Sequence, residues 1–371
     1  MVEPESGTGP RLRAAVIGTG GISKEHLRFL AGSPRADLVG VCDMSPIAVS
    51  HAATTYGTTA YATVDEMLAG ARPEVVHVLT PPTTHVALSE LCLTAGADVI
   101  CEKPITLGAA DLERLLAFAD DAGRRICENH NYRFNPEVLE LDSLVESGVL
   151  GRVGEVEVRM GLPVNDPDGR FGDPNLPSPI HQLPAGVIHD FITHLTYLVD
   201  NFTPGVEWLT VDSRWSNHGG VAHVAVDDLD SILVGDGPDG AVHARIRFSA
   251  LLAPDCFEIT VRGTEGYAQV ELFSGRVSRV IPRPGGKQLS PIVNMMVGGA
   301  TMFAGGPRSL KRKIMQQGPY VGLERFLDLT YAALAAGTEL PVTPADMLAT
   351  SRLIDRLVAG RSVGAAPEVV S

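Results

Sequence analysis

A glycine-rich turn set directly between a strand and a helix constrains this chain more than any other feature. Residues Arg11–Ile17 form an apolar run typical of a strand, Gly18–Ser23 reads G-T-G-G-I-S, and a helical pattern follows. The first glycine permits a tight turn, the second lets the backbone approach a pyrophosphate, and the third position needs only a small residue, so serine can stand there. The turn predicts a dinucleotide-binding domain at the start of the chain. The cofactor contacts predicted in it are Gly18, Gly20, Gly21 and Ile22.

The rest of the first third alternates short apolar runs with helical patterns. The predicted strands are Leu38–Cys42, Val75–Leu79 and Asp98–Cys101, and the predicted helices include Thr83–Ala95 and Gly108–Ala122. Continuous apolar strands alternating with helices indicate an α/β domain with a parallel sheet covered on both faces. Right-handed crossovers bring the loops after the strands to one edge. We expect residues 1–129 to form this Rossmann domain.

The pattern changes after about Asn129. Helices are predicted over Phe134–Ser147, Ala185–Val199, Leu323–Ala335 and Pro344–Leu357. Apolar and polar residues alternate over Val153–Met160 and in the runs from about Val206 to Val280, which indicates an open, mostly antiparallel sheet. We expect residues 130–371 to form an α+β domain for substrate binding and oligomerisation. Residues 163–184 are rich in Pro, Gly and Asp and predict a loop. Residues 282–318 have weak periodicity and much Gly and Met, and we interpret them as a loop, lid or oligomer contact.

Charge and cysteine content exclude several classes of protein. The formal net charge is −14, whereas nucleic acids and anionic membranes attract clustered Lys and Arg. The basic cluster Arg308–Lys313 is short, and we interpret it as a solvated face or a subunit contact. The five cysteines include no CxxC pair and favour a reducing compartment. No stretch is long enough to span a bilayer, so a cytoplasmic protein is expected.

The residue at the end of the second strand bears on cofactor choice. Asp43 lies 23 residues after Gly20, where a carboxylate can accept both ribose hydroxyls of adenosine. It would repel a 2′-phosphate, and Met44–Pro46 contains no arginine to receive one. The sequence therefore favours NAD over NADP. The alternative for Asp43 is a helix-capping or turn role.

Three further segments resemble one enzyme family. They are Thr80–His85 (TPPTTH), Ala95–Pro104 (AGADVICEKP) and Ala185–His194 (AGVIHDFITH). Together with the opening glycines they resemble the glucose–fructose oxidoreductase, inositol dehydrogenase and rhizopine-catabolism (Gfo/Idh/MocA) oxidoreductase family. Gly263–Gly266 (GTEG) is similar to a turn of the same family. The resemblance extends over nearly the whole chain, and it implies a Rossmann domain followed by a substrate-binding domain.

The resemblance implies catalytic roles for three residues. Lys103 would lie beside the nicotinamide and hydrogen-bond the reacting oxygen, next to Glu102 and a cis peptide before Pro104. Asp190 and His194 would face the substrate, with His194 as proton acceptor. The non-catalytic alternatives are that Lys103 is an exposed charge at a strand end, and that Asp190 and His194 are a pair on a helix face with no catalytic role.

Further contacts are implied by the same resemblance. The cofactor contacts outside the glycine turn would be Asp43, Thr80, Pro81, Pro82, His85, Glu102 and Lys103. Arg133, in the segment that links the domains, would contact substrate. Where the family often has glycine, this chain has Ile192, which leaves the fold expectation intact but weakens any transfer of substrate.

Elementary chemistry agrees with these assignments. Oxidation of a secondary alcohol removes a hydride, which a nicotinamide accepts, and a proton, which a histidine suits. Asp190 and His194 are four residues apart and share a helix face, whereas His189 points about 100° away and is more typical of packing. His181, in the loop, is another candidate substrate contact. No metal-binding spacing occurs, so no metal is predicted.

The sequence therefore predicts an NAD-dependent oxidoreductase acting on a secondary alcohol or ketone of a sugar, cyclitol or glycoside. One alternative is a glycosidase- or lyase-like enzyme that uses tightly bound NAD in a transient oxidation. A second is a nucleotide-binding regulator without catalysis. A homodimer or homotetramer is expected, because the open sheet leaves one broad face to cover.

Overall fold

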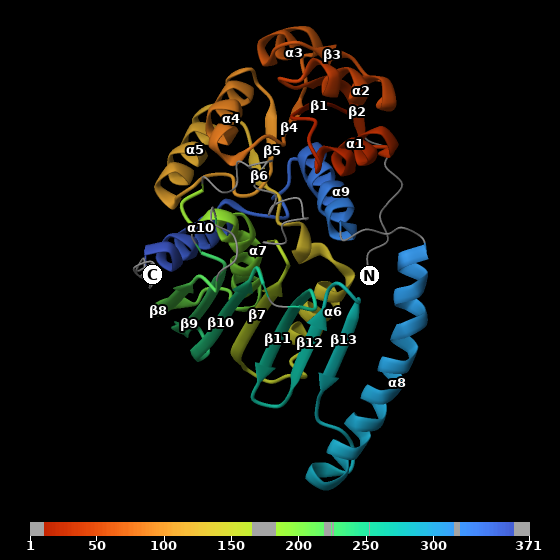
Figure 1. The fold of residues 1–371 in the computed structure, drawn as a ribbon, viewed down its shortest axis with the longest axis vertical. Helices are drawn as coiled ribbons and strands as arrows, with labels where there is room; N and C mark the ends of the chain where they lie inside the picture. Colours follow the sequence, from red (N-terminus) through yellow and green to blue (C-terminus); the bar gives the residue numbers. More distant parts are fainter. Residues whose placement is uncertain are drawn as a thin grey trace, which may run out of the picture. The chain divides into compact units, whose positions relative to one another are not determined.

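The computed structural model describes residues 11–164, 183–218, 224, 226–251, 253–314 and 320–359. At residues 287 and 304–314 it describes the backbone alone. The chain divides into two compact units, each with its own sheet (Figure 1). Unit 1 comprises Met1–Phe134 with Gly322–Ser351, and unit 2 comprises Asn135–Val321 with Arg352–Ser371.

Unit 1 contains a six-stranded parallel sheet in the order β3-β2-β1-β4-β5-β6. Because the strand order reverses between β1 and β4, the loops after these strands diverge, which is where doubly wound folds bind nucleotides. The parallel sheet was predicted from the sequence, and the structure confirms it. Its strands are β1 (Leu12–Ile17), β2 (Ala36–Cys42), β3 (Ala60–Tyr61), β4 (Val75–Val78), β5 (Asp98–Cys101) and β6 (Ile126–Glu128).

Helices cover both faces of this sheet. In the first 134 residues they are α1 (Ser23–Gly32), α2 (Pro46–Tyr56), α3 (Val64–Ala71), α4 (His85–Thr94) and α5 (Ala109–Asp121), with short 3-10 turns η1 (Pro82–Thr84) and η2 (Asn131–Phe134). The late helix α9 (Val321–Ala336) also contributes to the core of unit 1, where Phe326 lies 5.4 Å from Phe134 between ring centroids. The first half of α10 (Pro344–Ala359) joins the same unit.

Unit 2 contains a seven-stranded sheet in the order β13-β12-β11-β7-β10-β9-β8. Every neighbouring pair is antiparallel except β7 with β10, so the sheet is mixed and mostly antiparallel, as predicted. Helices α6 (Pro136–Glu146) and α7 (Gly186–Phe202) pack against it. The strands are β7 (Val153–Gly161), β8 (Glu207–Ser216), β9 (Asp228–Gly237), β10 (Gly240–Ser249), β11 (Cys256–Gly263), β12 (Tyr267–Glu271) and β13 (Arg276–Val280).

The expectation of a loop over residues 282–318 is wrong for most of that segment. The structure has a long helix there, α8 (Gly286–Ile314), beside the edge strand β13 (Figure 1). Its sequence hides the helix because Gly298, Gly299 and Pro307 are poor helix formers. None of the described helices is long and apolar enough to cross a membrane.

Candidate active site

The glycine turn after β1 is built around Gly18 and Gly20. Gly18 has φ +95°, and a Cβ there would lie 2.8 Å from the carbonyl oxygen of Leu79, so only glycine fits. A Cβ at Gly20 would meet nothing within 4 Å, which leaves open space beside the backbone. Ser23, which stands at the third position of the motif, is buried, and its hydroxyl donates to the Gly20 carbonyl at 2.6 Å. The turn is therefore rigid and exposes backbone at the start of α1.

Asp43 joins the end of β2 to this turn. Its carboxylate accepts from the Thr19 amide (2.6 Å), the Thr19 hydroxyl (2.9 Å) and the Ser45 amide (2.8 Å). Burial raises the pKa of Asp43, but the hydrogen bonds from Ser45 and Thr19 outweigh it, so the pKa lies below the usual value. Asp43 is thus an ionised, half-buried carboxylate beside the glycine turn. The turn role considered from the sequence is present, and a ribose contact is compatible with it.

The strand end at Glu102–Pro104 is held by side chains from several elements. Glu102 is buried, and its Oε1 accepts from Asn129 Nδ2 at 2.6 Å and lies 3.2 Å from His26 Nε2. Burial raises the pKa of Glu102, but His26, Asn129 and the neighbouring Lys103 together lower it below its usual value. Lys103 is half-buried, and the peptide before Pro104 is cis, as predicted.

His85 and the segment before it close one side of this strand end. The His85 ring is fully buried, with Nδ1 2.9 Å from the Pro104 carbonyl and Nε2 2.6 Å from the Thr80 carbonyl. Burial lowers the pKa of His85 more than these two carbonyls raise it. Pro81 is exposed and Pro82 half-buried, in a turn where the Thr84 hydroxyl donates to the Pro81 carbonyl at 2.8 Å. His85 therefore ties the loop after β4 to Pro104.

Sequence reasoning missed a second anchor at the end of β6. Glu128 is buried, its Oε1 accepts from the Ile105 amide at 2.8 Å, and its Oε2 lies 2.9 Å from His130 Nε2. Glu128 thus fixes the chain just after Pro104, as Glu102 fixes it just before. The available signal was a pair of carboxylates, Glu102 and Glu128, at the ends of adjacent buried strands.

Arg133, predicted to contact substrate, has a carboxylate partner inside unit 1. Its guanidinium Nη1 lies 3.3 Å from Asp346 Oδ2 of α10. Burial raises the pKa of Asp346, whereas Arg133 and hydrogen bonds from Thr343 lower it, with a net fall. The ion pair anchors the start of α10 near the end of the Rossmann sheet. A substrate contact by Arg133 remains a proposal.

Helix α7 of unit 2 presents the other candidate residues. His194 is buried, and its Nδ1 lies 2.9 Å from the Tyr197 hydroxyl, which orients the ring. Asp190, one turn earlier, is half-buried, whereas His189 and Ile192 are buried. His181 lies outside the described residues. Over the part of the chain that the structure describes, no three His, Cys, Asp or Glu side chains gather into a possible metal site.

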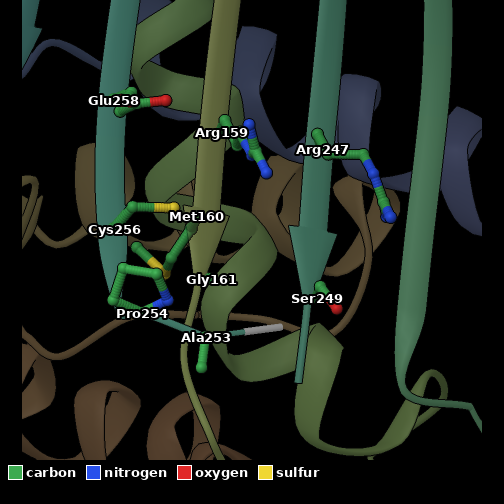
Figure 2. A pocket seen from close by; sticks show the side chains of 9 residues that line it. All are labelled: Arg159, Met160, Gly161, Arg247, Ser249, Ala253, Pro254, Cys256 and Glu258. Carbon is green, nitrogen blue, oxygen red and sulfur yellow. The ribbon is translucent and has the colours of Figure 1, made fainter. Parts of the chain in front are cut away.

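Unit 2 also has a cavity of about 220 Å³ at the ends of β7 and β10 and the start of β11 (Figure 2). Its lining includes Arg159, Arg247, Ser249, Cys256 and Glu258. In the figure Cys256 and Ser249 lie on either side of Gly161, and Glu258, Arg159 and Arg247 lie further along the strands. The Arg247 guanidinium is already paired with Asp228, at 2.5 and 2.8 Å. No residue selected from the sequence lines this cavity.

Comparison with known proteins finds a family match for the first third of the chain. Residues 12–130 match a family model described as "Oxidoreductase family, NAD-binding Rossmann fold". Over these residues the chain is similar to the Gfo/Idh/MocA oxidoreductase family, as the motifs suggested. The matched region is the domain that contains the glycine turn, Asp43, Thr80–His85 and the Glu102–Pro104 strand end.

Individual relatives are similar over part or all of the chain. An inositol 2-dehydrogenase from Rhizobium meliloti (strain 1021) is 33% identical over 147 residues, covering 40% of this chain and 43% of the relative. A D-glucoside 3-dehydrogenase from Escherichia coli (strain K12) is 29% identical over 148 residues, covering 39% and 42%. The chain thus matches less than half the length of these curated relatives. The WlbA dehydrogenase from Bordetella pertussis, solved with NADH and UDP-GlcNAcA, has the same fold, with a TM-score of 0.74, 20% identity and coverage of 94% and 95%.

Proposed function

We propose that this chain is an NAD-dependent oxidoreductase that acts on a secondary alcohol or ketone of a sugar, cyclitol or glycoside. The observation that carries the proposal is the edge of the unit 1 sheet. There an open glycine turn, an ionised Asp43 and the Glu102–Lys103–Pro104 strand end follow strands of one parallel sheet. Loops after parallel strands on the two sides of a switch point are where such folds bind dinucleotides.

The residues present fit an NAD molecule. Gly20 leaves room for a pyrophosphate at the start of α1, where backbone amides and the helix dipole favour anions. Asp43 would hold the adenosine ribose hydroxyls and, being ionised, would repel the 2′-phosphate of NADP. Next to it Met44 is 100% exposed and Ile47 is 84% exposed, which offers apolar surface to an adenine ring.

The chain's own residues would handle the proton and the developing charge. A bound nicotinamide would supply the hydride acceptor or donor. Lys103 would stabilise the alkoxide that forms as the substrate hydroxyl loses its proton. His194 would take that proton, with its ring oriented by the Tyr197 hydroxyl 2.9 Å from Nδ1. Asp190 would hold a second substrate hydroxyl on the same helix face.

The substrate class rests on the relatives. Those named above act, by their names, on inositol and on a D-glucoside, and the WlbA dehydrogenase was solved with a nucleotide sugar. All three ligands carry ring hydroxyl groups. For this chain a polyol ring is therefore the first class of substrate to test.

The test is to incubate the protein at near-stoichiometric concentration with NAD⁺ and a panel of sugars, cyclitols and glycosides, and to follow the absorbance of reduced nicotinamide. A rise with one class of compound, lost in both Lys103→Ala and His194→Ala, supports the proposal. Full turnover in both variants contradicts the catalytic assignment. Consumption of a glycoside without net NADH indicates the transient-oxidation alternative, and NAD binding without any exchange of substrate hydrogen indicates the regulator.

We further propose a cytoplasmic homodimer or homotetramer. The five cysteines are free thiols, which suits a reducing compartment. The seven-stranded sheet and α8 carry exposed apolar side chains, among them Ile232, Met295 and Phe303. Light scattering coupled to size exclusion measures the assembly, and a monomer at micromolar concentration contradicts this part of the proposal.

A further inference from the structure

A chain of buried polar side chains leads from helix α9 to the Glu102 carboxylate. The Tyr331 hydroxyl lies 2.9 Å from His77 Nε2, His77 Nδ1 lies 2.8 Å from His26 Nδ1, and His26 Nε2 lies 3.2 Å from Glu102 Oε1. Tyr331, His77 and His26 are each 0% exposed. The four residues come from α9, β4, α1 and the end of β5, all in unit 1. Neutral apolar side chains would fill such a space at lower cost, so a continuous polar chain calls for a role.

The carboxylate fixes the direction of this chain of hydrogen bonds. A carboxylate only accepts, so His26 carries its proton on Nε2. A neutral His26 then accepts at Nδ1, His77 donates from Nδ1, and Tyr331 donates its hydroxyl proton to His77 Nε2. In this arrangement every buried proton has an acceptor and no cation is buried. The reverse arrangement would leave the Tyr331 hydroxyl proton without an acceptor, because among the described residues His77 Nε2 is the one polar atom within hydrogen-bonding distance of that hydroxyl.

The electrostatics of the buried groups agree with a neutral His77 and an ionised Glu102. Burial, and secondarily the neighbouring His26, hold the pKa of His77 well below the usual histidine value. Burial alone raises the pKa of Tyr331 well above its usual value, so its hydroxyl keeps its proton. Asn129 Nδ2 donates to the same Oε1 of Glu102 that faces His26. Glu102 is thus held as a carboxylate by contacts from both His26 and Asn129.

We propose that Tyr331, His77 and His26 are positioning residues that orient the Glu102 carboxylate and, through the adjacent backbone and charge, the amine of Lys103. The role of Lys103 in this inference rests on the proposed function, whereas the series of hydrogen bonds from Tyr331 to Glu102 does not. Since His26 lies in the first turns of α1, the same residues couple the helix that follows the glycine turn to the strand end that carries Lys103. The residues act through Glu102 and do not touch substrate.

The first measurement needs no variant and no substrate. In protein labelled with ¹⁵N-histidine, two-bond ¹H–¹⁵N correlation spectra report which ring nitrogen carries the proton. We expect the Nδ1–H form at His77 and the Nε2–H form at His26, assigned by the loss of signals in His77→Phe and His26→Gln. An Nε2–H form at His77, or a doubly protonated His26, overturns the proposed direction.

The second measurement separates positioning from packing with two variants on α9. Tyr331→Phe removes the terminal hydroxyl of the chain. Thr330→Val, the matched control, removes a buried hydroxyl that bonds only the Phe326 carbonyl of its own helix. We expect Tyr331→Phe to lower kcat by roughly 10- to 100-fold, the range that misplacement of a reacting group can cost, with little change in NAD⁺ affinity. Thr330→Val should change neither.

A readout independent of turnover distinguishes the two levels of inference. After reductive ¹³C-methylation, the Lys103 signal, assigned by its loss in Lys103→Met, should shift in Tyr331→Phe and stay in place in Thr330→Val. If the wild type turns over no substrate but this shift and the tautomers are as expected, the proposed function fails and the positioning chain stands. An unmoved Lys103 signal in folded Tyr331→Phe, or an equal effect of Thr330→Val, overturns the proposed positioning role.

Discussion

Gly18 and Gly20 stand two residues apart in one turn, yet their substitution should have opposite consequences. Alanine at Gly18 would combine φ +95° with a clash against the Leu79 carbonyl, so we expect Gly18→Ala to lose roughly 1–3 kcal/mol of stability or more. Alanine at Gly20 meets no atom within 4 Å, so we expect a stability change below about 0.5 kcal/mol. Its methyl group would instead occupy the space proposed for the pyrophosphate and weaken NAD⁺ binding at least about tenfold.

Thermal unfolding and NAD⁺ titration of both variants check these expectations. The comparison is sharp because the two substitutions add the same methyl group. A Gly20→Ala protein that binds NAD⁺ like the wild type would remove the proposed pyrophosphate site from this turn. A Gly18→Ala protein with wild-type stability would contradict the backbone geometry itself.

Asp43 is expected to decide between NAD and NADP by its charge. Asp43→Asn keeps an acceptor for Thr19 but removes the negative charge that would repel a 2′-phosphate. We expect the preference for NAD⁺ over NADP⁺ in binding to fall at least about tenfold, which corresponds to roughly 1.4 kcal/mol. Thr19→Val is the control, because it removes one hydrogen bond to Asp43 without changing charge. Equal preferences in wild type and Asp43→Asn would assign Asp43 to the turn alone.

The residues proposed to contact cofactor and substrate could be selected from the sequence, whereas the buried residues that hold them in place could not. Gly18, Asp43 and Lys103 stand in local motifs whose spacing reflects a turn or a strand end. His26 of α1 and His77 of β4 meet across 51 positions of sequence, and Tyr331 lies a further 254 positions beyond His77. A histidine inside the apolar run of β4 was the one local sign. Sequence periodicity does not indicate which residue this histidine contacts in the folded protein.

At the scale of elements, α8 is the part of the fold that the sequence concealed. Most of its described side chains are exposed, and Asn294 is an exception at 6% exposure. Asn294 Oδ1 accepts from Arg283 Nε at 3.1 Å, and its Nδ2 donates to the Ile281 carbonyl at 2.8 Å. Ser290, one turn earlier, adds a contact, because its hydroxyl accepts from the Arg283 amide at 3.2 Å and lies 3.5 Å from the Ile281 carbonyl. Two polar side chains thus tie the helix to the segment after β13, and Asn294 makes the shorter hydrogen bonds. Elements with a buried apolar stripe, such as α7, were predicted to within about three residues, because burial imposes the periodicity that is read from sequence.

Removing Asn294 from this tie should loosen α8 without unfolding unit 2. In Asn294→Ala, the Ile281 carbonyl and the Arg283 side chain each lose the hydrogen bond to Asn294, at a cost of roughly 1–3 kcal/mol. We expect amide hydrogen exchange over residues 286–303 to accelerate about tenfold or more, while β7 and β10 stay protected. Met295→Ala, at a side chain that is 72% exposed, is the control and should exchange like the wild type. Unchanged exchange in Asn294→Ala would mean that other contacts hold the helix.

At the scale of the whole molecule, the chain returns to unit 1 after completing the second sheet. Helix α9 supplies Tyr331 and Phe326 to the core of unit 1, and Asp346 of α10 pairs with Arg133. From the glycine turn and the strand pattern, the Rossmann domain could be predicted only as far as about residue 129. The amphipathic pattern of a late helix such as α9 does not indicate which of the two sheets it packs against. Unit 1 therefore cannot be complete as an N-terminal fragment. Its folding depends on residues more than 180 positions further along.

The acid sensitivity of unit 1 should exceed that expected from carboxylates alone. His77 and His85 are buried and have pKa values below the usual 6.5, because burial disfavours the imidazolium. Below pH 6.5 the unfolded chain takes up protons that the folded chain does not, so stability is full above this pH and falls as pH decreases. The slope is up to about 1.4 kcal/mol per pH unit for each histidine. Carboxylates with lowered pKa values, such as Glu102, reduce the stability of the fold only when the pH falls below their unfolded pKa of 4.5.

Urea unfolding at pH about 7, about 6 and about 5 tests this sign and window. Both tryptophans, Trp208 and Trp215, lie in β8, so tryptophan fluorescence follows unit 2, while far-UV circular dichroism follows both units. In the wild type the dichroism transition attributable to unit 1 should move to lower urea as pH falls. His85→Gln cannot take up that proton in either state, so the movement should be smaller, and the fluorescence transition should be the same in variant and wild type.

If His85→Gln shows the same pH dependence as the wild type, His85 is protonated in the folded state, and both ring nitrogens then donate to the Thr80 and Pro104 carbonyls. The strand end would in that case carry a second fixed positive charge beside Lys103.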